Sequence, residues 1–403
     1  METTSMASFT TNQPNIGFNY DDLWRNTSCY EMGLAGKSFM INYYHFPPEF
    51  FLNAFYKQHN YVLKFYLSPL VGLLGILMNL TFLFVLARVP DMRTVTNVYL
   101  GSLAVADTMF LTASAVDLLK TWQSNTGLLL NHPYYTNAQC VSFNLSIKLT
   151  FYGSVCMITL VAFERYMAIC HPLKHRMVSG KRYTIKVTVV TWLVAVIMGT
   201  LGCLKTVRSN SYCFLWPPGL KEMAYVYIGD DRTVCNALSP IWWAVSHGMQ
   251  SVFFAANLCL NILLYCSIIR RLGKRNVGGE GNQERQRELQ RVQNQVAKML
   301  IINGTVFFIL MVPYEINTFV EFIWTVTWHM RSNGEATAIR NLEFYGTCLR
   351  FINSALNPLI YGLSNSRYRQ AYRKAFGCAR KERKQPTSVD NKAAVLTAST
   401  NNI

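Results

Sequence analysis

The sequence has few charged residues. Asp, Glu, Lys and Arg make up 15% of its 403 residues, whereas 51% of the residues are hydrophobic. Soluble globular domains average about 25% charged residues, so this balance argues against a soluble protein. The eleven cysteines show no paired C-x-x-C spacing, and we find no glycine-rich phosphate loop and no nucleophile triad. We therefore predict neither a metal cluster nor an enzyme.

The N-terminal segment has no recognisable cleavable signal peptide. Residues 1–61 do not contain the basic stretch and apolar run of a cleavable signal peptide. They do contain Asn26, which is followed by Thr and Ser and so forms a glycosylation acceptor sequence, one that is used outside the cell. We predict that residues 1–61 are extracellular and that Asn26 is glycosylated.

Long apolar segments account for the high hydrophobic content. Each of seven segments is long enough to cross a bilayer, which needs about 20 apolar residues. They lie at residues 62–88, 95–121, 138–171, 183–207, 241–272, 293–327 and 338–363. The sequence therefore predicts an all-α integral membrane protein, with a seven-helix transmembrane bundle over residues 62–364.

The basic residues show which side of the membrane each connector occupies. The net charge is +17, and Lys and Arg gather in the first, third and fifth connectors and in the C-terminal tail. Because cytoplasmic loops are enriched in Lys and Arg, these connectors are expected inside the cell and the N-terminus outside. Membrane topology therefore accounts for the positive charge, and we do not expect a nucleic-acid partner.

The segment after the seventh span is amphipathic. Residues 365–378 alternate aromatic and basic residues, which predicts a short eighth helix on the inner lipid leaflet. Cys378 at its end is either palmitoylated or unmodified. Residues 379–403 are polar, and we expect a disordered cytoplasmic tail.

Several ionisable residues lie inside the apolar segments. Asp107 is in the middle of the second, and Glu164 and Arg165 are near the inner end of the third. Such residues are costly in a membrane, so they usually have partners or a function, although Glu164 and Arg165 could also be a simple interfacial pair. The polar residues Ser154, Asn353 and Asn357 could converge on Asp107, to hydrate it or to hold a sodium ion with it.

Taken together, these motifs resemble those of the rhodopsin-like (class A) G-protein-coupled receptors. The resemblance covers residues 62–378 and rests on motifs in the family's order, any one of which is weak alone. They are Asn79, LAVAD ending at Asp107, Cys140, ERYMAICHPL from Glu164, Trp192, Phe307 with Pro313, and NPLIY from Asn357. The stretches around Thr94 and Arg165 look most like the neuropeptide receptors, in particular the thyrotropin-releasing-hormone and neuromedin-like branches.

The resemblance implies roles for individual residues. Arg165, flanked by Glu164 and Tyr166, would face the G protein on activation, and two tyrosines would then reach it. The residues assigned to activation and coupling are Glu164, Arg165, Tyr166, Tyr265, Asn357, Pro358 and Tyr361. The residues assigned to an allosteric sodium ion are Asp107, Ser154, Asn353 and Asn357.

Two positions depart from the family pattern. Asn257 stands where the fifth span usually has proline, and Met311 stands where the sixth usually has tryptophan. Both positions belong to the family's activation machinery, so an altered switch or an unusual basal activity is expected.

The charges in the outer half of the bundle indicate a peptide ligand. Ile147 replaces the aspartate of amine receptors, and Phe351 replaces the retinal-binding lysine of opsins. The candidate ligand-binding residues are Asp117, Lys148, Glu315, Glu321 and Arg350. A purely structural alternative is that Glu315 and Arg350 pair with each other.

A disulfide is expected at the outer rim. Cys140 could bond to Cys213 or Cys235 of the long second outer loop, because this compartment is oxidising. By resemblance to the family, the predicted partner is Cys235. Cys213 would then pair with Cys29 or stay free.

The predicted function is that of a plasma-membrane receptor. An extracellular neuropeptide would activate it, and it would signal through a heterotrimeric G protein, with the Gq/calcium route as one possibility. Arrestin, receptor kinases and membrane lipid are the other expected partners. The alternatives are a class A receptor for a small non-peptide ligand and, more remotely, a seven-span transporter or channel, for which the sequence lacks the internal repeats.

Overall fold

The computed structural model describes residues 38–42, 58–123, 136–178, 180–217, 219, 231–239, 241–275, 284–329 and 332–377. By its contacts the chain divides into two compact units, which are described separately. Unit 1 comprises residues 1–67, 116–144 and 203–242, and unit 2 comprises residues 68–115, 145–202 and 243–403. The helices α5 and α6 each contribute residues to both units.

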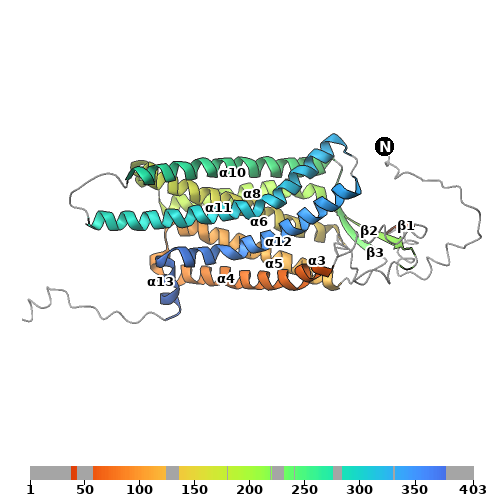
Figure 1. Cartoon of the computed structure of the whole chain (residues 1–403), viewed down its shortest axis with the longest axis horizontal. Coiled ribbons are helices and arrows are strands. Elements are labelled where there is room, and N and C mark those ends of the chain that lie inside the picture. The colour runs from red at the N-terminus through yellow and green to blue at the C-terminus, as the bar shows by residue number, and fades with distance from the viewer. Residues whose placement is uncertain are drawn as a thin grey trace, which may run out of the picture. The chain divides into compact units, whose positions relative to one another are not determined.

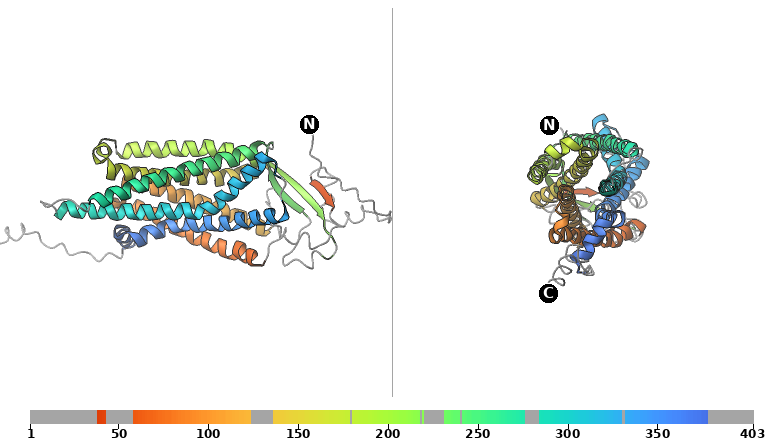
Figure 2. Two further views of the ribbon diagram at one scale, coloured as in Figure 1. Left: turned by 45° about the horizontal axis from the view of Figure 1, so that its top comes forward. Right: turned by 90° about the vertical axis from the view of Figure 1, so that its left-hand side faces the viewer.

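Long helices make up unit 2, and Figures 1 and 2 show them running side by side. Their bounds are α4 Ser68–Arg88, α5 Val95–Gln123, α6 Asn137–Cys170, α8 Lys181–Cys203, α10 Ile241–Arg275, α11 Glu284–Thr327 and α12 Asn333–Ser364. Among the described residues, six helices are long and apolar enough to cross a membrane, and α12 is not one of them. The predicted seventh span nevertheless forms one continuous helix, in which Arg350, Asn353 and Asn357 reduce the apolar character.

The helix bounds agree with the predicted spans to within five residues, except that α11 begins nine residues before the predicted residue 293. The first predicted span, residues 62–88, corresponds to the short helix α3 Gln58–Val62, a π-helical turn Leu63–Leu67, and α4. Short helices complete the unit: a 3₁₀ turn Pro90–Met92 precedes α5, and α7 Pro172–Val178 follows α6. Helix α7 is not expected from the sequence.

The outward faces of the helices are apolar, as expected next to lipid. On α4, Leu70, Leu73 and Leu77 are all more than half exposed, and on α8 so are Leu193 and Ile197. An apolar surface of this extent would be unfavourable in water. The polar residues lie inside instead: Asn79, Asp107, Asn303 and Asn357 are at most 2% exposed.

The amphipathic eighth helix predicted over residues 365–378 is α13, Ser366–Ala375. Asn365 caps its N-terminus by accepting a hydrogen bond from the Arg367 backbone N–H at 2.9 Å. Its apolar face, with Tyr368, Ala371 and Ala375, is buried against the bundle. The Tyr368 hydroxyl donates to Asn97 Oδ1 at 2.6 Å, which fixes α13 to the start of α5.

Unit 1 contains a small sheet that the sequence analysis did not predict. The strands are β1 Ser38–Asn42, β2 Arg208–Leu215 and β3 Asp231–Asn236, in the order β1-β2-β3. β2 and β3 are antiparallel, with Ser209 opposite Cys235, and β1 lies parallel to β2, with Met40 opposite Cys213. The N-terminal segment is thus joined to the loop between α8 and α10 by backbone hydrogen bonds.

Candidate functional site

Arg165 is held in place at one end of α6. Its Nε lies 2.7 Å from Glu164 Oε2, and its guanidinium also donates to the Thr96 hydroxyl on α5. Thr96 in turn donates to Glu164 Oε2 at 3.2 Å, and His175 of α7 lies 3.3 Å from Glu164 Oε1. The two charged side chains are only 16% and 10% exposed. Glu164 is therefore the centre of a hydrogen-bonded group that links α5, α6 and α7, which we call the Arg165 latch.

A cavity of about 120 Å³ lies beside the Arg165 latch. Its walls come from α5, α6, α11 and α13, and include Thr96, Arg165, Val296, Arg367 and Tyr368. Arg165 therefore both belongs to the latch and lines this cavity.

The tyrosines predicted for activation lie toward this end of unit 2. Tyr361 is buried and packs against Phe82 and Tyr368, with ring centroids 5.2 Å and 5.8 Å away. Tyr265 is buried on α10, with its hydroxyl close to the backbone of Gly304 on α11. Within the described part of the chain, neither tyrosine has a hydrogen bond to Arg165. Tyr166 contacts His171 at 3.1 Å instead.

Asp107 is the centre of a second polar group, midway along the helices. Its Oδ2 accepts a hydrogen bond of 2.7 Å from Asn357 Nδ2, and Pro358 follows Asn357 inside α12. Asn79 donates to the Ser354 carbonyl at 2.9 Å, so α4, α5 and α12 are joined here. The direct bond from Asn357 to Asp107 agrees with the predicted convergence of these residues.

A small cavity of about 20 Å³ lies next to Asp107. Asp107, Ser154, Asn353 and Ser354 line it, and so does Arg350. Three of the four predicted sodium ligands therefore share this cavity, and the fourth, Asn357, binds Asp107 directly. Arg350 was assigned to ligand binding in the sequence analysis, with no link to Asp107.

A third polar group joins α6, α10 and α11. Lys148 Nζ donates to Gln250 Oε1, and Gln250 Nε2 donates to Glu315 Oε1 at 2.8 Å. All three side chains are buried, at 6%, 2% and 5% exposure. Gln250 was missed in the sequence analysis because a single glutamine in an apolar helix carries no motif. We call this group the Lys148 relay.

The alternative considered from the sequence, a pair between Glu315 and Arg350, is not present in the described structure. The Arg350 guanidinium instead lies over the rings of Phe110 and Tyr314, at 4.8 Å and 4.4 Å from their centroids. Asp117 and Glu321, the two remaining predicted ligand contacts, are half-buried. Asp117 belongs to unit 1 and Glu321 to unit 2.

Asn257, which stands where the family has proline, takes part in hydrogen bonds that link α6 and α10. Thr159 of α6 donates to Asn257 Oδ1 at 2.9 Å and accepts from Asn261 Nδ2 at 2.8 Å. Met311, which replaces the family's tryptophan, is buried and lines the cavity at Asp107. Met311 therefore lies in the packed interior of unit 2, whereas Asn257 is half-buried between α6 and α10.

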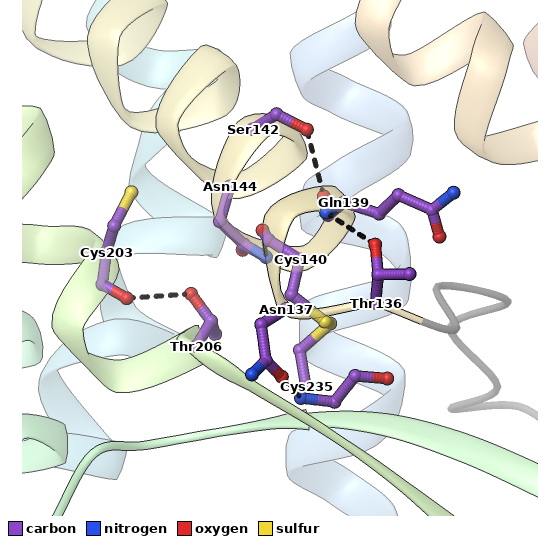
Figure 3. Close-up of a disulfide and its surroundings, with 10 residues drawn as sticks. Thr136, Asn137, Gln139, Cys140, Ser142, Asn144, Cys203, Thr206 and Cys235 are labelled. Carbon is purple, nitrogen blue, oxygen red and sulfur yellow. Dashed lines mark hydrogen bonds between the residues drawn. A yellow bond between two sulfur atoms is a disulfide. The ribbon is translucent and has the colours of Figure 1, made fainter.

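The disulfide prediction for unit 1 is confirmed. Cys140 at the start of α6 is bonded to Cys235 of β3, as Figure 3 shows. Asn137 accepts a hydrogen bond of 2.8 Å from the Ser209 backbone N–H and so fixes β2 to the same helix end. Cys213 is also disulfide-bonded, so it is not free. Asn26, Cys29 and Cys378 lie outside the described residues.

Comparisons with known proteins agree with this arrangement. Residues 78–361 match the family described as 7 transmembrane receptor (rhodopsin family). The chain is 28% identical over 350 residues to a thyrotropin-releasing hormone receptor of Gallus gallus, with 78% of each chain covered. It is 26% identical over 314 residues to the growth hormone secretagogue receptor type 1 of Homo sapiens, covering 75% of this chain and 77% of that one. With its transmembrane helices, the Arg165 latch and the disulfide at Cys140, the chain belongs to the rhodopsin family of seven-transmembrane receptors.

Proposed function

We propose that an extracellular neuropeptide activates this receptor, which then promotes nucleotide exchange on a heterotrimeric G protein. The observation that carries this proposal is the Arg165 latch. In it, the family's arginine is bound to Glu164 and Thr96 at the edge of a cavity of about 120 Å³.

Activation in this proposal breaks the Arg165 latch and widens the cavity beside it. A ligand can shift such an equilibrium only by binding the open state more tightly than the closed state. Tyr265 and Tyr361, which pack close to this end in the closed arrangement, would then turn toward Arg165. The G protein would bind the widened cavity, and arrestin and receptor kinases would act at the same cytoplasmic side.

The peptide class is supported by the relatives and by the polar interior. The similar receptors are named for thyrotropin-releasing hormone and for growth hormone secretagogues, and we propose a ligand of comparable kind. Within unit 2, the proposed ligand-binding charges are Lys148 and Glu315 of the Lys148 relay, with Glu321 on α11 beyond them. Asp117 stays a predicted contact.

The proposal includes an orientation in the plasma membrane. The sheet, the Cys140 disulfide and Asn26 would lie outside the cell, because disulfides and glycans form in the secretory compartment. The Arg165 latch and α13 would lie inside, with the basic face of α13 against the lipid headgroups.

A screen on intact cells tests this proposal. Cells expressing the receptor or its Arg165→Ala variant are exposed to a neuropeptide library, with calcium and cAMP as the two readouts and with surface expression measured for both. We expect at least one peptide to give a response in the wild type that Arg165→Ala abolishes. A response of the same size in Arg165→Ala, at equal surface expression, would contradict the proposed role of the latch.

A further inference from the structure

The cavity at Asp107 is lined by both a negative and a positive side chain. Asp107 is 2% exposed and Arg350 is 7% exposed, so both charges are removed from solvent. The other polar walls are Thr150, Ser154, Asn353 and Ser354. The oxygens in this set suit a hard cation such as sodium, but the guanidinium of Arg350 does not.

The surroundings of Arg350 explain how its buried positive charge is stabilised. Its guanidinium lies over Phe110 and Tyr314, whose ring faces stabilise a positive charge. A buried cation also needs a negative charge nearby. No carboxylate of the described residues lies within ion-pair distance of Arg350, and Glu315 is bonded to Gln250 of the Lys148 relay. The carboxylate that lines the same cavity is Asp107.

The size of the cavity limits what it can hold. Its volume of about 20 Å³ accommodates roughly one water molecule. One water in this cavity could accept a hydrogen bond from Arg350 and donate one to Asp107. A sodium ion in the same space would add a second positive charge beside the guanidinium, where the low dielectric strengthens the repulsion.

We propose that Arg350 is the resident cation of the Asp107 cavity and that this receptor therefore does not bind sodium there. Arg350 takes the place of the ion that the family resemblance implies. The carboxylate at Asp107 would then be neutralised from within the chain, by a charge on α12.

Thermal unfolding of the purified full-length receptor tests this proposal, with sodium itself as the probe. The melting temperature is measured in sodium chloride and in N-methylglucamine chloride, at the same ionic strength of about 0.15 M. A cation that binds only the folded state raises the melting temperature by mass action. This measurement needs no peptide, so its result does not depend on the proposed function.

We expect the wild type to melt at the same temperature in both salts. Arg350→Gln should gain stabilisation by sodium, Arg350→Lys should stay insensitive, and Asp107→Asn added to Arg350→Gln should remove the gain. Stabilisation of the wild type by sodium would overturn the proposal even if no variant folds. Folded Arg350→Gln that remains insensitive would overturn it as well, because Arg350 would then not be what excludes the ion.

Discussion

At the scale of single residues, three charges that are shielded from solvent each lie next to a specific polar partner. Arg165 has Glu164 and Thr96, Asp107 has Asn357, and Glu315 has Gln250. A buried charge without such a partner is strongly destabilising, so these bonds hold the helices in one arrangement. Changing one partner should therefore shift the balance between the closed and the active arrangement.

The Arg165 latch gives the first prediction. Glu164→Gln removes the negative charge that accepts from Arg165 and Thr96 but keeps the shape of the side chain. A hydrogen bond to a charged group is worth about 1.5–3 kcal/mol, so basal nucleotide exchange should rise several-fold. Basal exchange is measured on membranes with added G protein. Thr112→Val, which removes a hydroxyl that bonds only to its own helix, is the matched control on α5 and should leave basal exchange unchanged.

The second prediction concerns the Lys148 relay. Double-mutant cycles of alanine variants, read by thermal unfolding, should give a coupling of about 0.5–3 kcal/mol for Gln250 with Glu315, which are in contact. Glu315 and Arg350 should be additive, because the described structure has no bond between them. Strong coupling between Glu315 and Arg350 would show that the pairing alternative from the sequence is correct after all.

At the scale of helices, packing depends on small residues at points of close approach. Gly346 on α12 lies against the backbone of Tyr314 on α11, where an added Cβ would come within 2.9 Å of the Tyr314 Cα and N atoms. Backbone atoms cannot move aside as a flexible side chain can. Tyr314 directly follows Pro313, so the contact lies where the α11 hydrogen-bond ladder is already interrupted.

This contact gives the third prediction. Gly346→Ala should lower the stability of the receptor by about 1–3 kcal/mol, because it overpacks the interface between α11 and α12. Gly362→Ala on the same helix, where nothing lies within 4 Å, is the control. It should be neutral or stabilising by up to about 1 kcal/mol, since alanine favours the helix. If both variants melt at the same temperature, the close approach does not limit stability.

The helix bounds could be predicted well from the sequence, but the contacts between helices could not. Apolar length alone located the spans, since each bilayer crossing needs a similar number of residues. Helix rise placed Glu315 and Arg350 at similar depths, but it does not specify which way each side chain faces. That is why the sequence suggested a pair, whereas Glu315 bonds to Gln250 and Arg350 lies between aromatic rings.

At the scale of the whole molecule, disulfides fasten the loop strands. Cys140–Cys235 closes a sequence separation of 95 residues, which stabilises by about 4–5 kcal/mol in the chain-entropy model. The sequence identified this bond through the family resemblance. It could not predict the sheet, because the strands β1 and β2 lie far apart in the sequence.

The fourth prediction compares how much each of the two disulfides contributes to surface expression. Cys235→Ser should strongly reduce surface expression, because it removes the disulfide that ties β3 to α6. Cys213→Ser should reduce it less, and Cys29→Ser should have the same effect as Cys213→Ser if these two residues are partners. Cys259→Ser, which removes an exposed free thiol, is the control and should be silent. A harmless Cys235→Ser would contradict the assigned role of the bond.

Nucleotide exchange by the purified receptor tests the central claim most directly, which is that peptide binding releases Arg165 to act on a G protein. Purified receptor, heterotrimeric G protein and a peptide identified in the cell screen are combined, and nucleotide exchange is followed for the wild type and for Arg165→Ala. We expect the peptide to accelerate exchange in the wild type and not in Arg165→Ala, while both bind the peptide. Exchange that stays at the G protein's own rate in the wild type, despite bound peptide, would contradict the account.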